Sequence, residues 1–106
     1  YNKIAVVTDL KLKGYLLSPT HLVGKDKARV FASWGFDLTN WEYLRYELLK
    51  LVRLRKVVST ENLPSYTKFY VHGKIRIPRG GTRSVRTIWA IDQDKHKPHL
   101  VSAFPL

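Results

Sequence analysis

The stretch TNWEYLRYELLKLVRLRK, residues 39–56, carries the clearest structural pattern in the chain. Its apolar residues recur at the spacing of one helix face, which predicts a helix over residues 40–56. Thr39 as N-cap and Glu42 three residues later have the spacing of a capping box. Cations crowd the end of this helix and suit its dipole, so part of the positive charge there has a purely local explanation.

The pattern changes from helical to extended after this helix. The stretch FYVHGKIRIPRGGTRSVRTIWAI, residues 69–91, has alternating or β-branched residues on both sides of a turn at 78–81, which predicts antiparallel strands. Residues 59–65 read as a loop, and residues 100–104 as a last short strand. Helices followed by an antiparallel meander predict an α+β fold, with N-terminal helices packed on a C-terminal antiparallel sheet of about four strands.

The segment before residue 39 has weaker signals. Residues 4–7 predict a strand or an extended lead-in. Asp9 has the position of a cap for a short helix that runs to Leu17. Residues 25–34 predict a helix that ends at Gly35.

Charge is the strongest compositional signal. The chain has 106 residues, enough for one domain, and its 19 Lys and Arg outweigh eight Asp and Glu to give a net charge of +11. A polyanion such as RNA, an anionic membrane surface or an acidic protein would offset the resulting self-repulsion. No apolar run is long enough to span a membrane, which predicts a soluble domain. Without Cys, disulfides and thiolate chemistry are excluded, and without Met we expect the C-terminal module of a longer polypeptide.

The predicted sheet carries many of these cations. Cations along strands with rings between them suit phosphate contacts and base stacking, and the alternative is a solvated strand face. The residues of this pattern are Lys68, Phe69, Tyr70, Lys74, Arg76, Arg79, Arg83 and Arg86.

His21 precedes a second group of cations. With Lys25, Lys27 and Arg29 near a helix N-terminus, it can bind a phosphate and move a proton at neutral pH, although a lone loop His is more often a plain surface residue. His96 and His99 are three residues apart in a Lys-rich loop, which is a poor metal cage. We therefore expect no metal site and no cofactor.

Several spaced motifs support a family resemblance over nearly the whole chain. They are Tyr15-Leu16-Leu17-Ser18-Pro19-Thr20-His21, Gly24, Lys27-Ala28, Gly35, Val85-Arg86-Thr87-Ile88-Trp89 and Pro98-His99-Leu100-Val101-Ser102-Ala103-Phe104. This order resembles a bacterial family of unknown function that reads Tyr-x-Leu-Asn-Pro-x-His-Pro-x-Gly-x-x-Lys-Ala, then Val-Arg-Thr/Ser-x-Trp and Pro-Arg-Leu-x-Thr/Ser-x-Tyr. The layout of that family looks like the barnase–EndoU–colicin–RelE-like group of small toxins.

The resemblance implies a function. It implies a single toxin-like domain over residues 1–106, a metal-independent ribonuclease that inhibits bacterial growth by acting on RNA in the bacterial cytoplasm. Delivery from a secreted or surface-exposed parent protein is expected, as is an acidic immunity protein or antitoxin that neutralises it. We expect a monomer when the inhibitor is absent. The alternatives are a non-catalytic basic nucleic-acid-binding module and a protein-interaction domain.

The resemblance also implies site residues. The expected catalytic residues are His21 as acid or base, Lys27 to neutralise phosphate, Arg86 to clamp it, and Ser102. The expected substrate-binding residues are Lys25, Arg29, Thr87, His99 and Phe104.

Two of these positions depart from the family pattern. His99 stands at the family Arg and is either a second proton carrier or an exposed residue at the start of a strand. Phe104 stands at the family Tyr and cannot donate a proton. Arg86 and Thr87 are neighbours on a strand, so only one can line the site, and we expect Arg86. Along the last strand we expect Ser102 to share a face with Leu100 and Phe104.

Overall fold

The computed structural model describes residues 5–17, 25–92 and 97–106, and the side chains of Tyr15, Lys25 and Asp26 also lie outside this description. The helical elements are α1 (Asp9–Lys11), a π-helical turn η2 (Leu12–Leu16), α2 (Lys25–Ser33) and α3 (Trp41–Leu54). The strands are β1 (Val57–Asn62), β2 (Tyr66–Arg76), β3 (Thr82–Asp92) and β4 (His99–Pro105).

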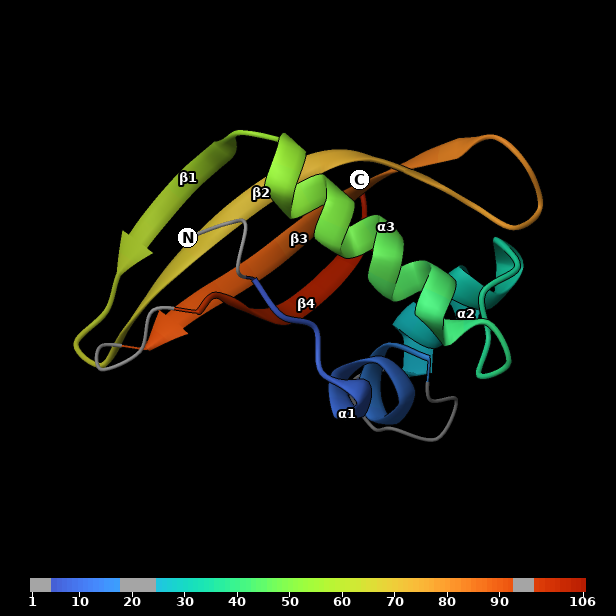
Figure 1. The fold of residues 1–106 in the computed structure, drawn as a ribbon, viewed down its shortest axis with the longest axis horizontal. Coiled ribbons are helices and arrows are strands. Elements are labelled where there is room, and N and C mark those ends of the chain that lie inside the picture. Colours follow the sequence, from blue (N-terminus) through green and yellow to red (C-terminus); the bar gives the residue numbers. More distant parts are fainter. Residues whose placement is uncertain (1–4, 18–24, 93–96) are drawn as a thin grey trace.

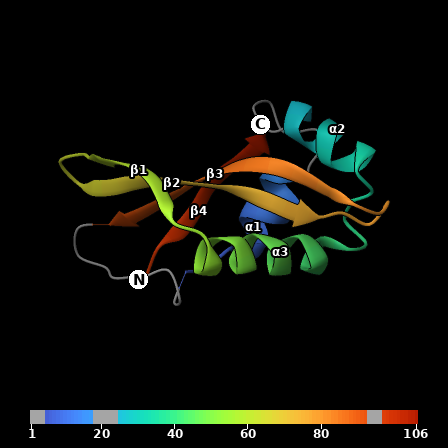
Figure 2. The same cartoon turned by 90° about the horizontal axis from the view of Figure 1, so that it is seen from above.

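The predicted α+β fold is confirmed. The four strands form one antiparallel sheet in the order β1-β2-β3-β4, and α3 runs across one face of it (Figure 1). Seen from above, α3 lies on one side of the sheet, while α2 lies towards the other side, beside the carboxyl end of β4 (Figure 2). Within the described ranges, no helix is long and apolar enough to cross a membrane.

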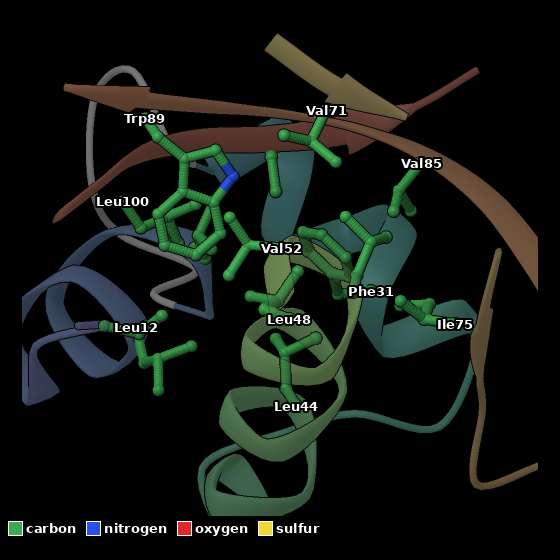
Figure 3. Close-up of a cluster of buried hydrophobic side chains, with 14 of the residues drawn as sticks. Leu12, Phe31, Leu44, Leu48, Val52, Val71, Ile75, Val85, Trp89 and Leu100 are labelled. Atoms are coloured by element: carbon green, nitrogen blue, oxygen red, sulfur yellow. The ribbon is translucent and has the colours of Figure 1, made fainter. Parts of the chain in front are cut away.

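The core lies between α3 and the sheet. Leu44, Leu48 and Val52 of α3 are fully buried and point towards the strands, as the helical spacing predicts (Figure 3). They meet inward side chains of β2 and β3, among them Val71 and Trp89. Burying a side chain of this size contributes about 1.5–3 kcal/mol, so this interface orients the helix on the sheet.

The predicted capping box at Thr39 and Glu42 is wrong. Asn40 is the N-cap of α3, and its side chain makes no bond to the helix. Instead the Asn40 side chain accepts from the Asp37 backbone N–H at 2.8 Å and donates to the Gly35 carbonyl at 2.8 Å. The Thr39 hydroxyl donates to the Asp37 carboxylate at 2.5 Å, so Thr39 and Asn40 stabilise the loop before α3 rather than its first turn.

The predicted loop over residues 59–65 is wrong for residues 59–62, since β1 occupies residues 57–62, and it is confirmed for residues 63–65. All six residues of β1 are exposed, and the strand pairs with β2 alone. A strand that is exposed to solvent on both faces needs no alternation of apolar and polar residues. The sequence of β1, VVSTEN, shows none. Its position is set by backbone pairing with β2, which the sequence pattern does not reveal.

The N-terminal segment differs from prediction in its details. Thr8, not Asp9, is the N-cap of α1, and its hydroxyl accepts from the Lys11 backbone N–H at 3.2 Å. Asp9 instead forms an ion pair with Arg45 of α3. Of the expected lead-in over residues 4–7, Val6 forms a parallel bridge to His99, and this ties the segment to the start of β4.

Candidate nucleic-acid interface

The two faces of the sheet have different characters. Along β3, Val85, Thr87 and Trp89 are buried towards α3, whereas Arg86 and Ile88 point the other way and are half-buried. We call this second side of the sheet the outer face. Its residues from the three longer strands include Lys68, Tyr70, His72, Lys74, Arg86, Ile88, Ala90, His99, Ser102 and Phe104.

Arg86 lies at the centre of a cluster on the outer face. It pairs directly with His72 on β2 and with Phe104 on β4, so the three side chains form one row across the sheet. Its guanidinium carbon lies 4.5 Å from the centre of the Tyr70 ring, a cation–π distance. This contact holds the guanidinium plane against a ring, and a stacked Arg still offers its N–H groups to a phosphate.

His72 is the functional candidate that sequence reasoning missed. It occupies the middle of β2 outside any motif, and only its pairing with Arg86 reveals its position. Its Nε2 atom and the Nε atom of Arg86 are both buried, and neither has a hydrogen-bond partner among the described residues. Because these two nitrogens are shielded from solvent, a phosphate or ribose oxygen would have to bind the other nitrogens of these half-buried side chains.

Lys27 and Phe104 border the cluster where α2 approaches the sheet. Lys27 lies in the first turn of α2, and its ammonium is 5.9 Å from the centre of the Phe104 ring. Phe104 is half-buried, so part of its ring remains available for stacking. The structure thus brings three of the predicted site residues, Lys27, Arg86 and Phe104, to one region.

A shallow hollow of about 210 Å³ lies at the other end of the outer face. A bulge at Val101 shifts the register of β4 and brings His99 opposite Ala90 on this face. The same bulge turns Leu100 inward opposite Trp89, so the prediction that Leu100 shares a face with Ser102 and Phe104 is wrong. The hollow is lined by Tyr66, Lys68, Ala90, Asp92, His99 and Val101.

His99 and His72 are too far apart to act on one phosphate. Ala90, the partner of His99, is four residues along β3 from Arg86, the partner of His72. At about 3.3 Å per residue this separation is about 13 Å along the strand, and the two histidines also lie on different sides of β3. His99 therefore lies beyond the cluster, at the edge of the shallow hollow.

The buried position of Thr87 does not fit its expected role in substrate binding. It is fully buried on the α3 side, where its hydroxyl donates to the Val71 carbonyl at 2.7 Å. The same oxygen accepts from the indole N–H of Trp89 at 2.8 Å. Thr87 therefore stabilises the core, and the prediction that Arg86 and Thr87 point to opposite faces is confirmed.

The expected roles of Ser102 and Arg29 stay predictions. Ser102 lies on the outer face opposite Ile88, but it is only 7% exposed and presents little surface to a substrate. Arg29 is two residues from Lys27 on α2 and so points away from it. It lines a separate, mainly apolar hollow of about 580 Å³ with Ala32 and Phe36.

Two further expected site residues are not placed. His21 lies outside the described residues, and Lys25 begins α2 but its side chain lies outside them as well. A single site that joins His21 to Arg86 therefore stays a prediction.

Residues 1–106 match the model of a family described as "Domain of unknown function (DUF6883)". No curated protein and no solved structure matches the chain.

Proposed function

The chain belongs to the DUF6883 family, and we propose that this domain is a ribonuclease that binds single-stranded RNA on the outer face of its sheet. The observation that carries the proposal is the row of His72, Arg86 and Phe104, with Tyr70 stacked beneath the Arg86 guanidinium. It combines a proton carrier, a phosphate ligand and two stacking rings on one surface. The net charge of +11 supports a polyanionic substrate.

The chemistry of metal-independent RNA cleavage requires three functions. A base removes the proton of the ribose 2′-hydroxyl, cations stabilise the charge on the phosphorane, and an acid protonates the leaving oxygen. His72 is our candidate for the base, because a neutral imidazole is an effective proton acceptor near pH 7. Arg86 is the candidate phosphate ligand, and Lys27 adds a second positive charge at the border with α2.

In the proposed reaction, the 2′-hydroxyl proton moves to His72 and the 2′-oxygen attacks the adjacent phosphorus. The bond from phosphorus to the 5′-oxygen then breaks, and that oxygen takes up a proton. The products are a 2′,3′-cyclic phosphate and a 5′-hydroxyl. His21 stays our prediction for the acid, and the Tyr70 hydroxyl is a second donor that lies on the same face as Arg86.

Substrate binding would combine stacking with charge. Tyr70 and Phe104 flank Arg86 from opposite sides, and both rings are half-buried. Stacking a base on an aromatic ring contributes about 1–3 kcal/mol per base and tolerates different sequences. The rings would thus hold unpaired bases while Arg86 holds the phosphate between them.

We further propose the biological setting that the family resemblance implies. The domain would inhibit bacterial growth from within the cytoplasm, and an acidic immunity protein or antitoxin would neutralise it. The positive charge of the chain supports an acidic inhibitor. Induced expression in bacteria should stop growth, and coexpression of the neighbouring reading frame should restore it.

A non-catalytic RNA-binding module is the second candidate. It is favoured by Phe104, which lacks the hydroxyl that the resembling family carries at this position. The test compares a single-stranded RNA with a DNA of the same sequence. A ribonuclease that uses the 2′-hydroxyl cleaves only the RNA, whereas a binding module leaves both intact. Persistent failure to cleave RNA that the domain binds would overturn the proposed activity.

A further inference from the structure

A second basic surface lies where the carboxyl-terminal half of α3 meets β2. Strand β1 pairs with β2 only as far as Val71, so the rest of that edge of β2 faces α3 rather than a strand. A hollow of about 260 Å³ lies here. We call it the basic cleft, and it is lined by Glu47, Lys50, Leu51, Leu54, Arg55, Lys74, Arg76 and Thr82.

The cleft is strongly positive. Four of its lining residues are cations and one is an acid. The single carboxylate, Glu47, is 5% exposed and accepts a hydrogen bond from the Arg76 backbone N–H at 2.6 Å. No ion pair joins Arg55, Lys74 or Arg76 to a carboxylate in the described part of the chain. Among the lining residues, Glu47 alone offsets their mutual repulsion, so the cleft keeps an excess of positive charge.

The dipole of α3 accounts for only two of the four cations in the cleft. Lys50 and Arg55 lie near the carboxyl end of α3, where cations are favourable. Lys74 and Arg76 come from β2, where no such dipole acts. Leu51 and Leu54 form an apolar wall beside them, and a low-dielectric wall concentrates the field of nearby charges. The arrangement favours a bound anion.

We propose that the basic cleft binds phosphate groups of the same RNA strand that occupies the outer face. This inference rests on the proposed function. Lys74 follows His72 on β2 at a distance of about 6.6 Å, and Arg76 follows Lys74 at the same interval, at about 3.3 Å per residue. An RNA strand that leaves His72 along β2 therefore passes Lys74 and Arg76 and reaches the cleft. The substrate is accordingly a single strand that extends several nucleotides beyond the cleaved bond.

The first experiment titrates inorganic pyrophosphate into the protein and follows backbone amide shifts by NMR. Saturable shifts should concentrate on residues 47–55 and 73–76. They should disappear in the double variant Lys74→Ala/Arg76→Ala and persist in the control Arg79→Ala/Lys97→Ala, whose exposed cations lie outside the cleft. Glu47→Gln keeps an acceptor for the Arg76 N–H but removes the negative charge, so it should tighten binding by roughly three- to tenfold. Amide shifts that are spread evenly over all basic residues would show that pyrophosphate has no specific site in the cleft.

The second experiment measures RNA affinity by fluorescence anisotropy. For a single strand of about 16 nucleotides, Lys50→Ala/Arg55→Ala should weaken binding about tenfold, because it removes two cations of the cleft and no residue of the outer face. It should also lower the slope of log affinity against log salt by about 1.4, since each phosphate contact contributes about 0.7. A strand of about four nucleotides, too short to span both surfaces, should bind the variant and the wild type equally. A variant that binds the long strand as tightly as the wild type does would overturn the inference.

The proposed ribonuclease activity and the proposed phosphate site in the basic cleft can be refuted independently of each other. If pyrophosphate binds the cleft but no RNA is cleaved, the anion site stands and the ribonuclease activity is wrong. If RNA is cleaved and the cleft variants bind long RNA as the wild type does, the activity stands and the cleft is wrong.

Discussion

His72 lies directly opposite Arg86 across the β2–β3 ladder, on the face of the sheet turned away from α3. Directly opposed residues have their Cβ atoms about 4.5–5.5 Å apart, so an imidazole and a guanidinium lie at the distance that one phosphodiester can bridge. Each of the two side chains also has a buried nitrogen without a partner among the described residues. This pair places an imidazole and a guanidinium side by side on the outer face.

Variants of Arg86 should separate the effect of its positive charge on cleavage from the effect of its planar guanidinium. Arg86→Lys keeps a positive charge but loses the planar fork that stacks on Tyr70 and binds two phosphate oxygens. We expect Arg86→Lys and Arg86→Ala both to reduce the cleavage rate by about 100-fold, as expected when a preorganised donor is lost. Single-turnover cleavage measures this. Near-normal cleavage by Arg86→Lys would show that only charge matters at this position.

Tyr70 should contribute through its ring and its hydroxyl separately. Tyr70→Phe keeps the ring, so RNA affinity should stay within about twofold, whereas Tyr70→Ala should lose about 1–3 kcal/mol of binding free energy. If the hydroxyl supplies a proton, Tyr70→Phe should lower the cleavage rate without altering affinity. Anisotropy and cleavage assays on the two variants distinguish these effects. Equal affinity of Tyr70→Ala and wild type would refute base stacking on this ring.

Replacing Thr87 should change the stability of the fold rather than the affinity for RNA. Thr87→Val leaves the buried indole N–H of Trp89 without its acceptor, which costs about 1–3 kcal/mol of unfolding free energy. Because Thr87 lies on the α3 side of the sheet, RNA affinity of the folded variant should not change. Urea denaturation and anisotropy provide the two readings. A variant of normal stability that binds RNA poorly would contradict the placement of Thr87 in the core.

Asp37 should make stability depend on acid pH. Hydrogen bonds from the Thr39 hydroxyl, and then from the Thr39 and Asn40 backbone, hold the pKa of Asp37 below its ordinary value of 3.8. A lowered folded-state pKa means that the carboxylate stabilises the fold above about pH 4, and this contribution is lost as pH falls through the folded-state pKa. Thr39→Val removes the largest cause, so an NMR titration should show the pKa of Asp37 rising towards 3.8. An unchanged pKa in Thr39→Val would refute this origin.

The sequence predicts the fold class well because its strongest signals are those of the core. Helical spacing over residues 40–56 and β-branched runs over residues 69–91 both record which side chains are buried. The predictions of a capping box and of a loop in place of β1 are wrong because these features depend on polar contacts and edge pairing. In these regions several arrangements satisfy the same pattern, and tertiary contacts choose between them.

The candidate site was harder to predict because it depends on strand register. A four-residue turn at 78–81 would pair Ile77 with Thr82 and place His72 opposite Thr87. In the structure, the Ile77 backbone N–H donates to the Gly81 carbonyl and Arg76 pairs with Thr82. Gly80 and Gly81, with φ of 102° and 81°, allow this tighter connection. A shift of one residue exchanges the faces of a strand, so the pair of His72 with Arg86 emerges only from the folded register.

The most direct test of the account is the rate at which His72→Ala cleaves a single-stranded RNA under single-turnover conditions. His99→Ala is the matched control, because His99 lies on the same face but about 13 Å further along the sheet. We predict that His72→Ala binds RNA within a few-fold of wild type and cleaves it about 100-fold or more slowly, the usual loss of a general base. His99→Ala should cleave within a few-fold of wild type. Wild-type cleavage by a folded His72→Ala, or loss of cleavage in His99→Ala alone, would contradict the assignment of the active site to His72 and Arg86.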